Sequence, residues 1–399
     1  MTAESHSETV PIPPRAGVMT FAVIFSLESL VRSLNSTVIS LQAYEILGSS
    51  QKVSMLATSV SLTVLLTTLF LPALLGRLRR RWAYTLGAAL MALSALMLAT
   101  HTLAGQWLGM FLRNNGAAIF NIALSLYILD NIRRQDLTRA EPIRLSLSTF
   151  SWMAGPALGV WLLIHFGPWG AQLAVLASLA LLMGAFWYVR LIDRSGALPE
   201  GTLQPFRPLA NVRRFVEQPR LRLAWLIAFG RSVFWTTFFI YAPILVVEGG
   251  LGKGVSGLVI SASQALLLAA YFSGAASRLW GIRAVISCSF VLCALASLGA
   301  GIAGTGAPYA AITFLLLGSL AASALDGVGG IPFLRSVRHF ERQRMTAVYR
   351  TFLDFSELIP AFLFSLALMW LPLGSVFIIL AAGLLTVGAL SWRFLPRSM

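Results

Sequence analysis

The chain has 399 residues, of which 57% are hydrophobic and only 11% are charged, and its mean hydropathy is +0.78. Soluble globular proteins carry about a quarter charged residues, so this composition excludes a water-soluble enzyme. The net charge is +15, with only two Lys among the 30 basic residues. In a soluble protein this excess would favour nucleic acid binding, but here the basic residues lie in the gaps between apolar runs. We therefore expect a membrane protein without a nucleic acid partner.

The cysteines and histidines predict neither a disulfide framework nor a metal site. Cys288 and Cys293 lie in one apolar run, and the four histidines are scattered along the chain. We expect no cofactor and no catalysis, because no His, Cys or carboxylate pair converges in the sequence. The polar, Pro-containing first 14 residues have no short apolar core and no small-residue cleavage site, so we expect no signal peptide.

Twelve apolar runs are long enough to cross a bilayer as helices of about 20 residues, with every backbone hydrogen bond made inside the segment. The runs are 17–46, 53–75, 83–103, 105–130, 146–166, 169–189, 223–247, 255–274, 284–303, 307–333, 351–371 and 373–392. The sequence therefore predicts an all-α integral membrane protein with twelve transmembrane helices, numbered below as spans one to twelve.

Basic residues alternate between successive gaps. Of the 30 Lys and Arg residues, 25 lie in the tails and in every second gap, namely 1–16, 76–82, 131–145, 190–222, 275–283, 334–350 and 393–399. The gaps between these hold only Lys52 and Lys253. By the positive-inside rule both termini are cytoplasmic. We expect a multi-pass protein of a cell membrane, specifically a bacterial inner membrane.

The longest polar gap, residues 190–222, separates six spans from six. The predicted parts are a cytoplasmic tail (1–16), a six-helix bundle (17–189), a cytoplasmic linker (190–222), a second six-helix bundle (223–392) and a second cytoplasmic tail (393–399). Within the linker, Leu209, Val212, Phe215 and Val216 fall at helical spacing. This spacing predicts either a short helix on the inner leaflet or a plain solvated linker.

The two sets of six spans repeat each other in sequence. Arg32 and Arg231 are 199 residues apart, and a serine follows each of them. Lys52 and Lys253 are 201 residues apart. A nearly constant offset over the first two spans of each set indicates a duplication. We therefore expect two pseudo-symmetric six-helix bundles.

Twelve spans, cytoplasmic termini, a basic central gap and parallel halves resemble the major facilitator superfamily (MFS) of secondary transporters. Within the family's motif in the loop between spans two and three, Gly76, Leu78 and Arg81 match. Arg80 stands where the family has Asp. The resemblance implies the twelve-helix MFS fold over essentially the whole chain.

Three further positions are similar to motifs of this family. Asp130 looks like the acidic partner of the loop arginine, and Arg113 resembles the signature arginine of span four. Gly155-Pro156 and Gly159 resemble the core of the span-five motif that is associated with antiporters. This core favours export.

Charged residues inside spans cost about 2.5–3.5 kcal/mol at the bilayer centre, so each needs a partner or a wet cavity. Glu28 and Arg32 lie one helical turn apart in span one and either neutralise each other or face the cavity. Arg231 is the repeat equivalent of Arg32, and Trp235 one turn later can stack on it. Such equivalent positions face the midplane site of parallel-repeat transporters. We expect Arg32 and Arg231 to hold an anionic or carboxylate-bearing group.

Other polar residues of the spans are further substrate-binding candidates. They are Asn35, Arg113, Trp235, Thr236, Tyr241 and Gln264. Helix packing is the alternative role for the amides. Asp326 in span ten, which has no basic residue within one turn in the sequence, is the first candidate for the proton-coupling residue, and Glu28 is the second. The alternative for Asp326 is a permanent ion pair with Arg113 or another arginine.

Candidates for gating lie at the predicted cytoplasmic ends of the spans. They are Arg79, Arg80, Arg81, Asp130, Asp354 and Glu357. Because the usual loop acid is missing, Asp354 could clasp Arg79 or Arg80 across the halves when the cytoplasmic side closes. The alternative is that Asp354 and Glu357 stabilise the first turns of their helix.

These features predict a secondary active transporter that moves a small organic solute by alternating access and is driven by protons. No Gly-x-x-x-x-Gly-Lys-Ser/Thr motif for ATP is present. Export of a drug or metabolite by antiport is favoured by the Gly155-Pro156 core. Proton-coupled uptake of an organic anion or sugar is the alternative, and a non-transporting receptor on the same fold is the alternative of another class. The expected partners are a small-molecule substrate, protons and the lipid bilayer, and we expect a monomer.

Overall fold

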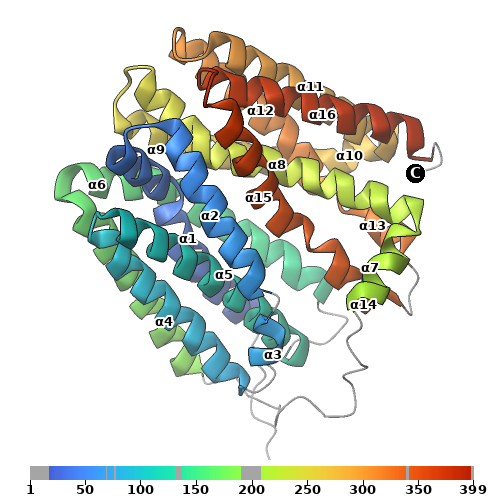
Figure 1. Ribbon diagram of the computed structural model, residues 1–399. Helices are drawn as coiled ribbons and strands as arrows, with labels where there is room; N and C mark the ends of the chain where they lie inside the picture. Colours follow the sequence, from blue (N-terminus) through green and yellow to red (C-terminus); the bar gives the residue numbers. More distant parts are fainter. Residues whose placement is uncertain are drawn as a thin grey trace, which may run out of the picture.

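The computed structural model describes residues 18–68, 70–75, 78–131, 137–189, 208–337 and 341–396, and within these ranges every regular element is a helix. In lipid the backbone groups of a span have no water to bond, so a helix that satisfies them internally is the stable solution. Figure 1 shows the blue-to-green helices α1–α6 in one bundle and the yellow-to-red helices α8–α16 in a second.

The N-terminal half contains α1 (Val18–Leu47), α2 (Ser50–Thr68), α3 (Leu71–Leu75), α4 (Arg80–Ala99), α5 (Leu103–Asn131) and α6 (Leu137–Val189). These helices coincide with the six predicted spans, with α2 and α3 sharing span two. Spans five and six form one continuous stretch, α6, that bends at Gly167. Gly167 has φ 67° and ψ −166°, a conformation that only glycine adopts without strain.

The C-terminal half repeats this order with more interruptions. It contains α8 (Pro219–Glu248), α9 (Lys253–Leu266), the 3₁₀ turn η1 (Leu267–Ala269), α10 (Ala270–Trp280), α11 (Ile282–Ala303), α12 (Pro308–Val328), α13 (Ile331–Ser336), α15 (Phe352–Ala367) and α16 (Gly374–Phe394). Span eight is therefore broken at η1, and span ten is divided into α12 and α13.

Eight helical stretches of the described chain are by themselves long and apolar enough to cross a membrane. One of them, Ser146–Val189, covers two predicted spans, so the eight account for nine of the twelve. The other three predicted spans are α2, α5 and α15. The predicted all-α membrane fold of twelve spans in two bundles is confirmed.

Equivalent serines make equivalent contacts in the two halves. The Ser33 hydroxyl of α1 donates to the carbonyl oxygen of Ser151 in α6 at 2.9 Å. In the other half, the Ser356 hydroxyl of α15 donates to the Ser232 hydroxyl of α8 at 2.7 Å. Ser33 and Ser232 are 199 residues apart, so spans one and five pair as spans seven and eleven do.

The glycines of the span-five motif allow α1 and α6 to approach closely. A Cβ atom on Gly155 would collide with the Ser33 side chain, and one on Gly159 would collide with the Leu34 carbonyl oxygen. The same segment faces the other half, because the Ala157 amide donates to the Ser261 hydroxyl of α9 at 3.0 Å. This motif therefore joins span one, span five and span eight.

The predicted linker contains a short helix, α7 (Pro208–Val216), and its place on the inner leaflet stays a prediction. Phe215 is buried in a cluster with Leu221, Phe333 and Met345. Arg214 forms an ion pair with Glu341 just before α14 (Arg342–Tyr349). α7 is thus fastened to the arginine-rich end of the C-terminal half. The tail 1–16 and residues 190–207 of the linker lie outside the described ranges.

We predict that Gly159→Ala destabilises the protein by about 1–3 kcal/mol, because the added methyl group forces α1 and α6 apart. Gly184→Ala is the matched control in the same helix, because a Cβ atom on Gly184 would contact nothing within 4 Å. Thermal unfolding in detergent measures both variants. Equal melting temperatures for the two variants would contradict the close approach of α1 and α6.

Candidate functional site

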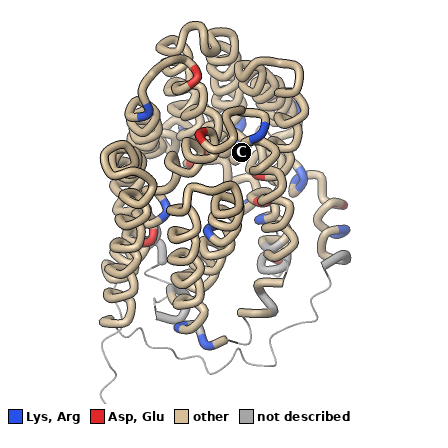
Figure 2. The backbone as a smooth tube through the Cα atoms, turned by 60° about the vertical axis from the view of Figure 1, so that its left-hand side comes forward, with Lys and Arg blue, Asp and Glu red and all other residues tan. Residues whose placement is uncertain are grey.

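Several charged residues lie at mid-length along the helices, away from the loops (Figure 2). On α1, Arg32 Nη1 lies 3.7 Å from Glu28 Oε1, and Glu28 is completely buried. Tyr84 and Arg144 also approach the Glu28 carboxylate. The expected neutralisation of Arg32 by Glu28 is present, but the carboxylate is shared with Arg144. Glu28 therefore lies inside the N-terminal bundle, and Arg32 lies at its edge.

Arg113 on α5 lies beside Arg32. Its Nη2 donates to the Arg32 carbonyl oxygen at 3.1 Å, and its Nη1 lies 3.5 Å from Asn114 Oδ1. Its Nε is buried and has no hydrogen-bond partner. Within the described part of the chain, Arg113 forms no ion pair. The guanidiniums of Arg32 and Arg113 repel each other, and no described carboxylate forms a close ion pair with Arg113.

A polar contact crosses the halves at the same corner. Asn114 Nδ2 on α5 donates to Glu357 Oε2 on α15 at 3.4 Å. Glu357 interacts electrostatically with Arg113 and Arg32, and Asp354 lies nearby on the same helix. Glu357, which we expected only at a gate, thus faces the arginines. The sequence contains no signal for this pairing, because α5 and α15 are 243 residues apart at this contact.

The C-terminal half holds a second charged group. Arg231 on α8 forms an ion pair with Asp326 on α12. Trp235 Nε1 donates to the other carboxylate oxygen of Asp326 at 2.9 Å. Trp235 therefore bonds the acid instead of stacking on Arg231, whose guanidinium lies 5.9 Å from the Phe352 ring centroid. The partner of Asp326 is Arg231, not Arg113.

Three other candidates are engaged in helix packing. Asn35 and Gln172 exchange two amide hydrogen bonds of 3.0 Å between α1 and α6. The Tyr241 hydroxyl bonds the Ser54 hydroxyl of α2 at 2.6 Å, which joins the two halves. Gln264 is buried on α9 and contacts only its neighbour Ser263 at 3.4 Å among the described residues. Thr236 is half-buried on α8.

The side of the molecule that carries the two lysines is closed by contacts between the halves. Glu45 at the end of α1 forms an ion pair with Lys253 at the start of α9. His101 Nε2, in the turn between α4 and α5, lies 3.2 Å from the other oxygen of Glu45. Ser40, which precedes Glu45 on α1, donates to the Phe239 carbonyl oxygen of α8 at 3.1 Å. This set of contacts was not expected from the sequence, and the matched lysines of the repeat were the available signal.

Apart from Glu357, the gating candidates on the arginine-rich side form no contact across the halves among the residues described. Arg79 is exposed and Arg81 is half-buried, while the side chains of Arg80 and Asp130 lie outside the description. Asp354 interacts electrostatically with Arg350, its neighbour in the chain. The clasp between Asp354 and Arg79 or Arg80 stays a prediction for the conformation in which this side closes.

Comparison with known proteins identifies the fold. The family model described as Major Facilitator Superfamily matches residues 21–268. No curated protein sequence matches the chain.

Solved transporters share this architecture at low identity. A POT family transporter in complex with a thioalcohol-conjugated peptide has a TM-score of 0.76 at 12% identity, covering 95% of this chain and 96% of that one. The nucleoside transporter NupG has a TM-score of 0.71 at 13% identity, with 94% and 98% covered. A D-xylose-proton symporter has a TM-score of 0.70 at 12% identity, with 96% and 99% covered. At these identities the likeness shows the fold alone.

We predict that reversing either charge of the Glu45 and Lys253 pair opens the lysine side. Glu45→Lys or Lys253→Glu replaces an attraction of about 0.2–1 kcal/mol with a repulsion of similar size. Spin labels at Gln51 and Gly252, in a protein with both cysteines replaced by Ser, measure the separation of the halves. The double reversal restores the closed distance, and Lys52→Glu is the control on the same side. Opening by the double reversal as well as by the singles would rule out the pair as a gate.

Proposed function

Since the chain belongs to the Major Facilitator Superfamily and is a secondary transporter, we propose that it moves a small organic solute with an anionic group, that protons drive the movement, and that the direction is export. Substrate, coupling and direction each have a separate physical basis in the site.

The pair of arginines in the N-terminal half carries the proposal for an anionic solute. Arg32 has one carboxylate at 3.7 Å, which Arg144 shares, and Arg113 keeps a buried Nε without a partner. A guanidinium removed from water is stabilised by a close anionic partner, so a ligand carboxylate or phosphate would supply the close partner that Arg113 lacks. Bidentate hydrogen bonds would hold such a group between α1 and α5. Asn114 of the same half and Glu357 of the other half would contact the remainder of the solute.

The Arg231 and Asp326 pair supports proton coupling. Asp326 bonds a guanidinium and an indole N–H at once, which are both donors to its ionised form. Protonation would remove the charge that holds Arg231, and α8 and α12 could then move relative to each other. Glu28 is the second candidate, but it is enclosed in one bundle with Arg32, Tyr84 and Arg144 around it. We therefore propose Asp326 as the coupling residue.

The span-five segment supports export. Gly155, Pro156 and Gly159 lie where α6 meets both α1 and α9, and this contact helps to close the lysine side. Stronger packing there favours the conformation that loads solute from the arginine-rich, cytoplasmic side. We further propose that both termini are cytoplasmic, that the membrane is a bacterial inner membrane, and that the protein acts as a monomer. Uptake of an organic anion or sugar is the second candidate, because the arginine pair can bind an anion from either side.

We predict that organic carboxylates or phosphates raise the melting temperature of the purified protein and that Arg113→Gln abolishes this shift. A ligand at 100 times its dissociation constant adds about 2.7 kcal/mol to the free energy of unfolding. Arg113→Lys keeps the charge without the planar fork and retains part of the shift. Arg222→Gln, at an exposed arginine on the predicted cytoplasmic side, is the control. Stabilisation by neutral or cationic compounds only would contradict an anion site.

We predict that Asp326→Asn abolishes solute movement driven by a proton gradient and leaves solute exchange across vesicles intact. The amide cannot gain or lose a proton at physiological pH, but it can still accept the Trp235 N–H. Right-side-out and inside-out vesicles report the direction, and export requires movement into the inside-out population. Glu217→Gln, at an exposed acid just after α7, is the control. Proton-driven movement by the Asn variant at the wild-type rate would remove Asp326 from the mechanism.

A further inference from the structure

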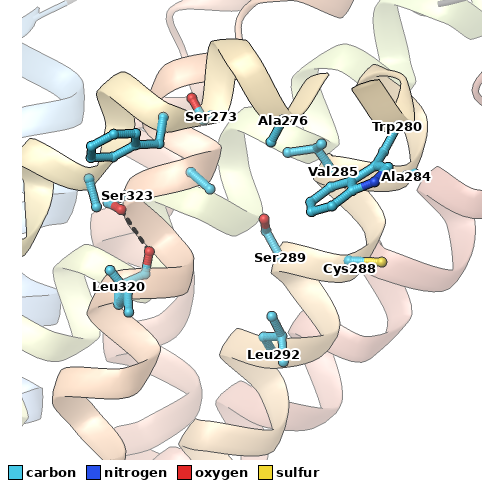
Figure 3. Close-up of a pocket in the computed structure, with 13 residues that line it drawn as sticks. Ser273, Ala276, Trp280, Ala284, Val285, Cys288, Ser289, Leu292, Leu320 and Ser323 are labelled. Carbon is cyan, nitrogen blue, oxygen red and sulfur yellow. Dashed lines mark hydrogen bonds between the residues drawn. The ribbon is translucent and has the colours of Figure 1, made fainter. Parts of the chain in front are cut away.

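A groove of about 370 Å³ lies between α10, α11 and α12 in the C-terminal half (Figure 3). Phe272, Trp280, Leu292 and Leu320 form its large apolar walls, and small Ala and Ser side chains form the rest. The Ser323 hydroxyl donates to the Leu320 carbonyl oxygen at 2.7 Å, which is the dashed line in Figure 3. The Ser273 hydroxyl likewise donates to the Ala270 carbonyl oxygen at 2.6 Å. Two of the three lining serines are thus bonded within their own helices, and the groove suits an apolar occupant.

The groove opens away from the site between the halves. α11 packs against α10, α12 and α16, which all belong to the C-terminal half. Phe272 is 76% exposed and Trp280 is 72% exposed. In a protein that spans a membrane, apolar rings on the outside of the bundle face the bilayer. The occupant of the groove therefore comes from the lipid phase.

One end of the groove is positively charged. Trp280 and Ala284 line that end on either side of the turn at Gly281, and Arg278 and Arg283 flank the same turn. Residues 249–325 contain no Asp or Glu. Neither arginine forms an ion pair with any described residue, and the Arg283 guanidinium lies 4.5 Å from the Trp392 ring centroid. An apolar groove thus ends at two unneutralised arginines beside a tryptophan.

We propose that this groove binds an anionic phospholipid from the leaflet on the arginine-rich side. One acyl chain lies between α10 and α11, and the headgroup phosphate contacts Arg278 and Arg283. The Trp280 indole marks the level at which acyl chain and headgroup meet. Ser323 and Ala324 of the wall are within one helical turn of Asp326, so the lipid supports α12 directly behind the ion pair with Arg231. This inference depends on the membrane fold and not on the solute that the protein moves.

Native mass spectrometry of the delipidated full-length protein tests the proposal, with phosphatidylglycerol and phosphatidylcholine of identical acyl chains as the two probes. The wild type retains phosphatidylglycerol in preference to phosphatidylcholine. Arg278→Gln and Arg283→Gln each weaken phosphatidylglycerol binding about fivefold, as expected for one basic residue at a lipid surface. Ala276→Trp and Ala284→Trp fill the groove and remove the lipid. Ala275→Trp is the matched control, because Ala275 is exposed on the same helix but does not line the groove.

Cys288 provides a second readout that needs no substitution. It is a free, exposed thiol in the groove wall, whereas Cys293 is buried. Phosphatidylglycerol slows alkylation of Cys288 by N-ethylmaleimide, and phosphatidylcholine at the same concentration does so less. Three results would each overturn the proposal. They are equal retention of the two lipids, equal loss of lipid in Ala275→Trp and Ala276→Trp, and an alkylation rate unchanged by phosphatidylglycerol. Because both readouts use binding and not transport, their failure leaves the proposed solute and proton coupling untouched.

Discussion

The structure depends on how charge is held inside a membrane-spanning bundle. An isolated guanidinium or carboxylate at mid-bilayer is costly, and so each must find a partner or water. The chain solves this differently in its two halves. In the C-terminal half Arg231 and Asp326 satisfy each other, with Trp235 as a further donor. In the N-terminal half Arg32 and Arg113 crowd together around carboxylates that they share with other groups. The incompletely paired half is the one to which we assign the anionic group of the solute.

This asymmetry sits between halves that otherwise mirror each other. Span one packs on span five as span seven packs on span eleven, through serines at equivalent positions. On the lysine side the halves are joined by the Glu45 and Lys253 pair and by Tyr241 with Ser54. On the arginine-rich side, Glu357 with Asn114 is the one such link that the described gating candidates make. The molecule is thus closed on the lysine side. Arg32, Arg113 and Glu357 lie between these contacts and the arginine-rich side.

Local sequence patterns predicted the spans because lipid leaves few choices for backbone hydrogen bonds. Apolar length located all twelve, and the matched arginines and lysines revealed the duplication. Partners within the site could not be predicted in the same way. Arg231 and Asp326 are 95 residues apart, and Asn35 pairs with Gln172 over 137 residues. Such contacts depend on how helices turn about their axes in the bundle. The spans are apolar on all sides, so their sequence does not reveal that rotation. Asn35, for example, was a candidate for the cavity but exchanges amide hydrogen bonds with Gln172 between α1 and α6.

The breaks within spans were also hidden from the sequence. Span eight changes to a 3₁₀ turn at Leu267–Ala269 without any proline or glycine there, so only its tertiary contacts can cause the interruption. The bend of α6, in contrast, falls on Gly167, whose φ of 67° shows why that residue type is required. Interruptions that follow from backbone chemistry are therefore predictable, and those imposed by packing are not.

The most direct test of the proposed anion site is a structure of the protein determined in a lipid bilayer with its transported solute bound. We predict density for an acidic group of the solute in contact with the guanidiniums of Arg32 and Arg113, between α1, α5 and α15. A solute held elsewhere, or either guanidinium directed into the surrounding lipid, would contradict it.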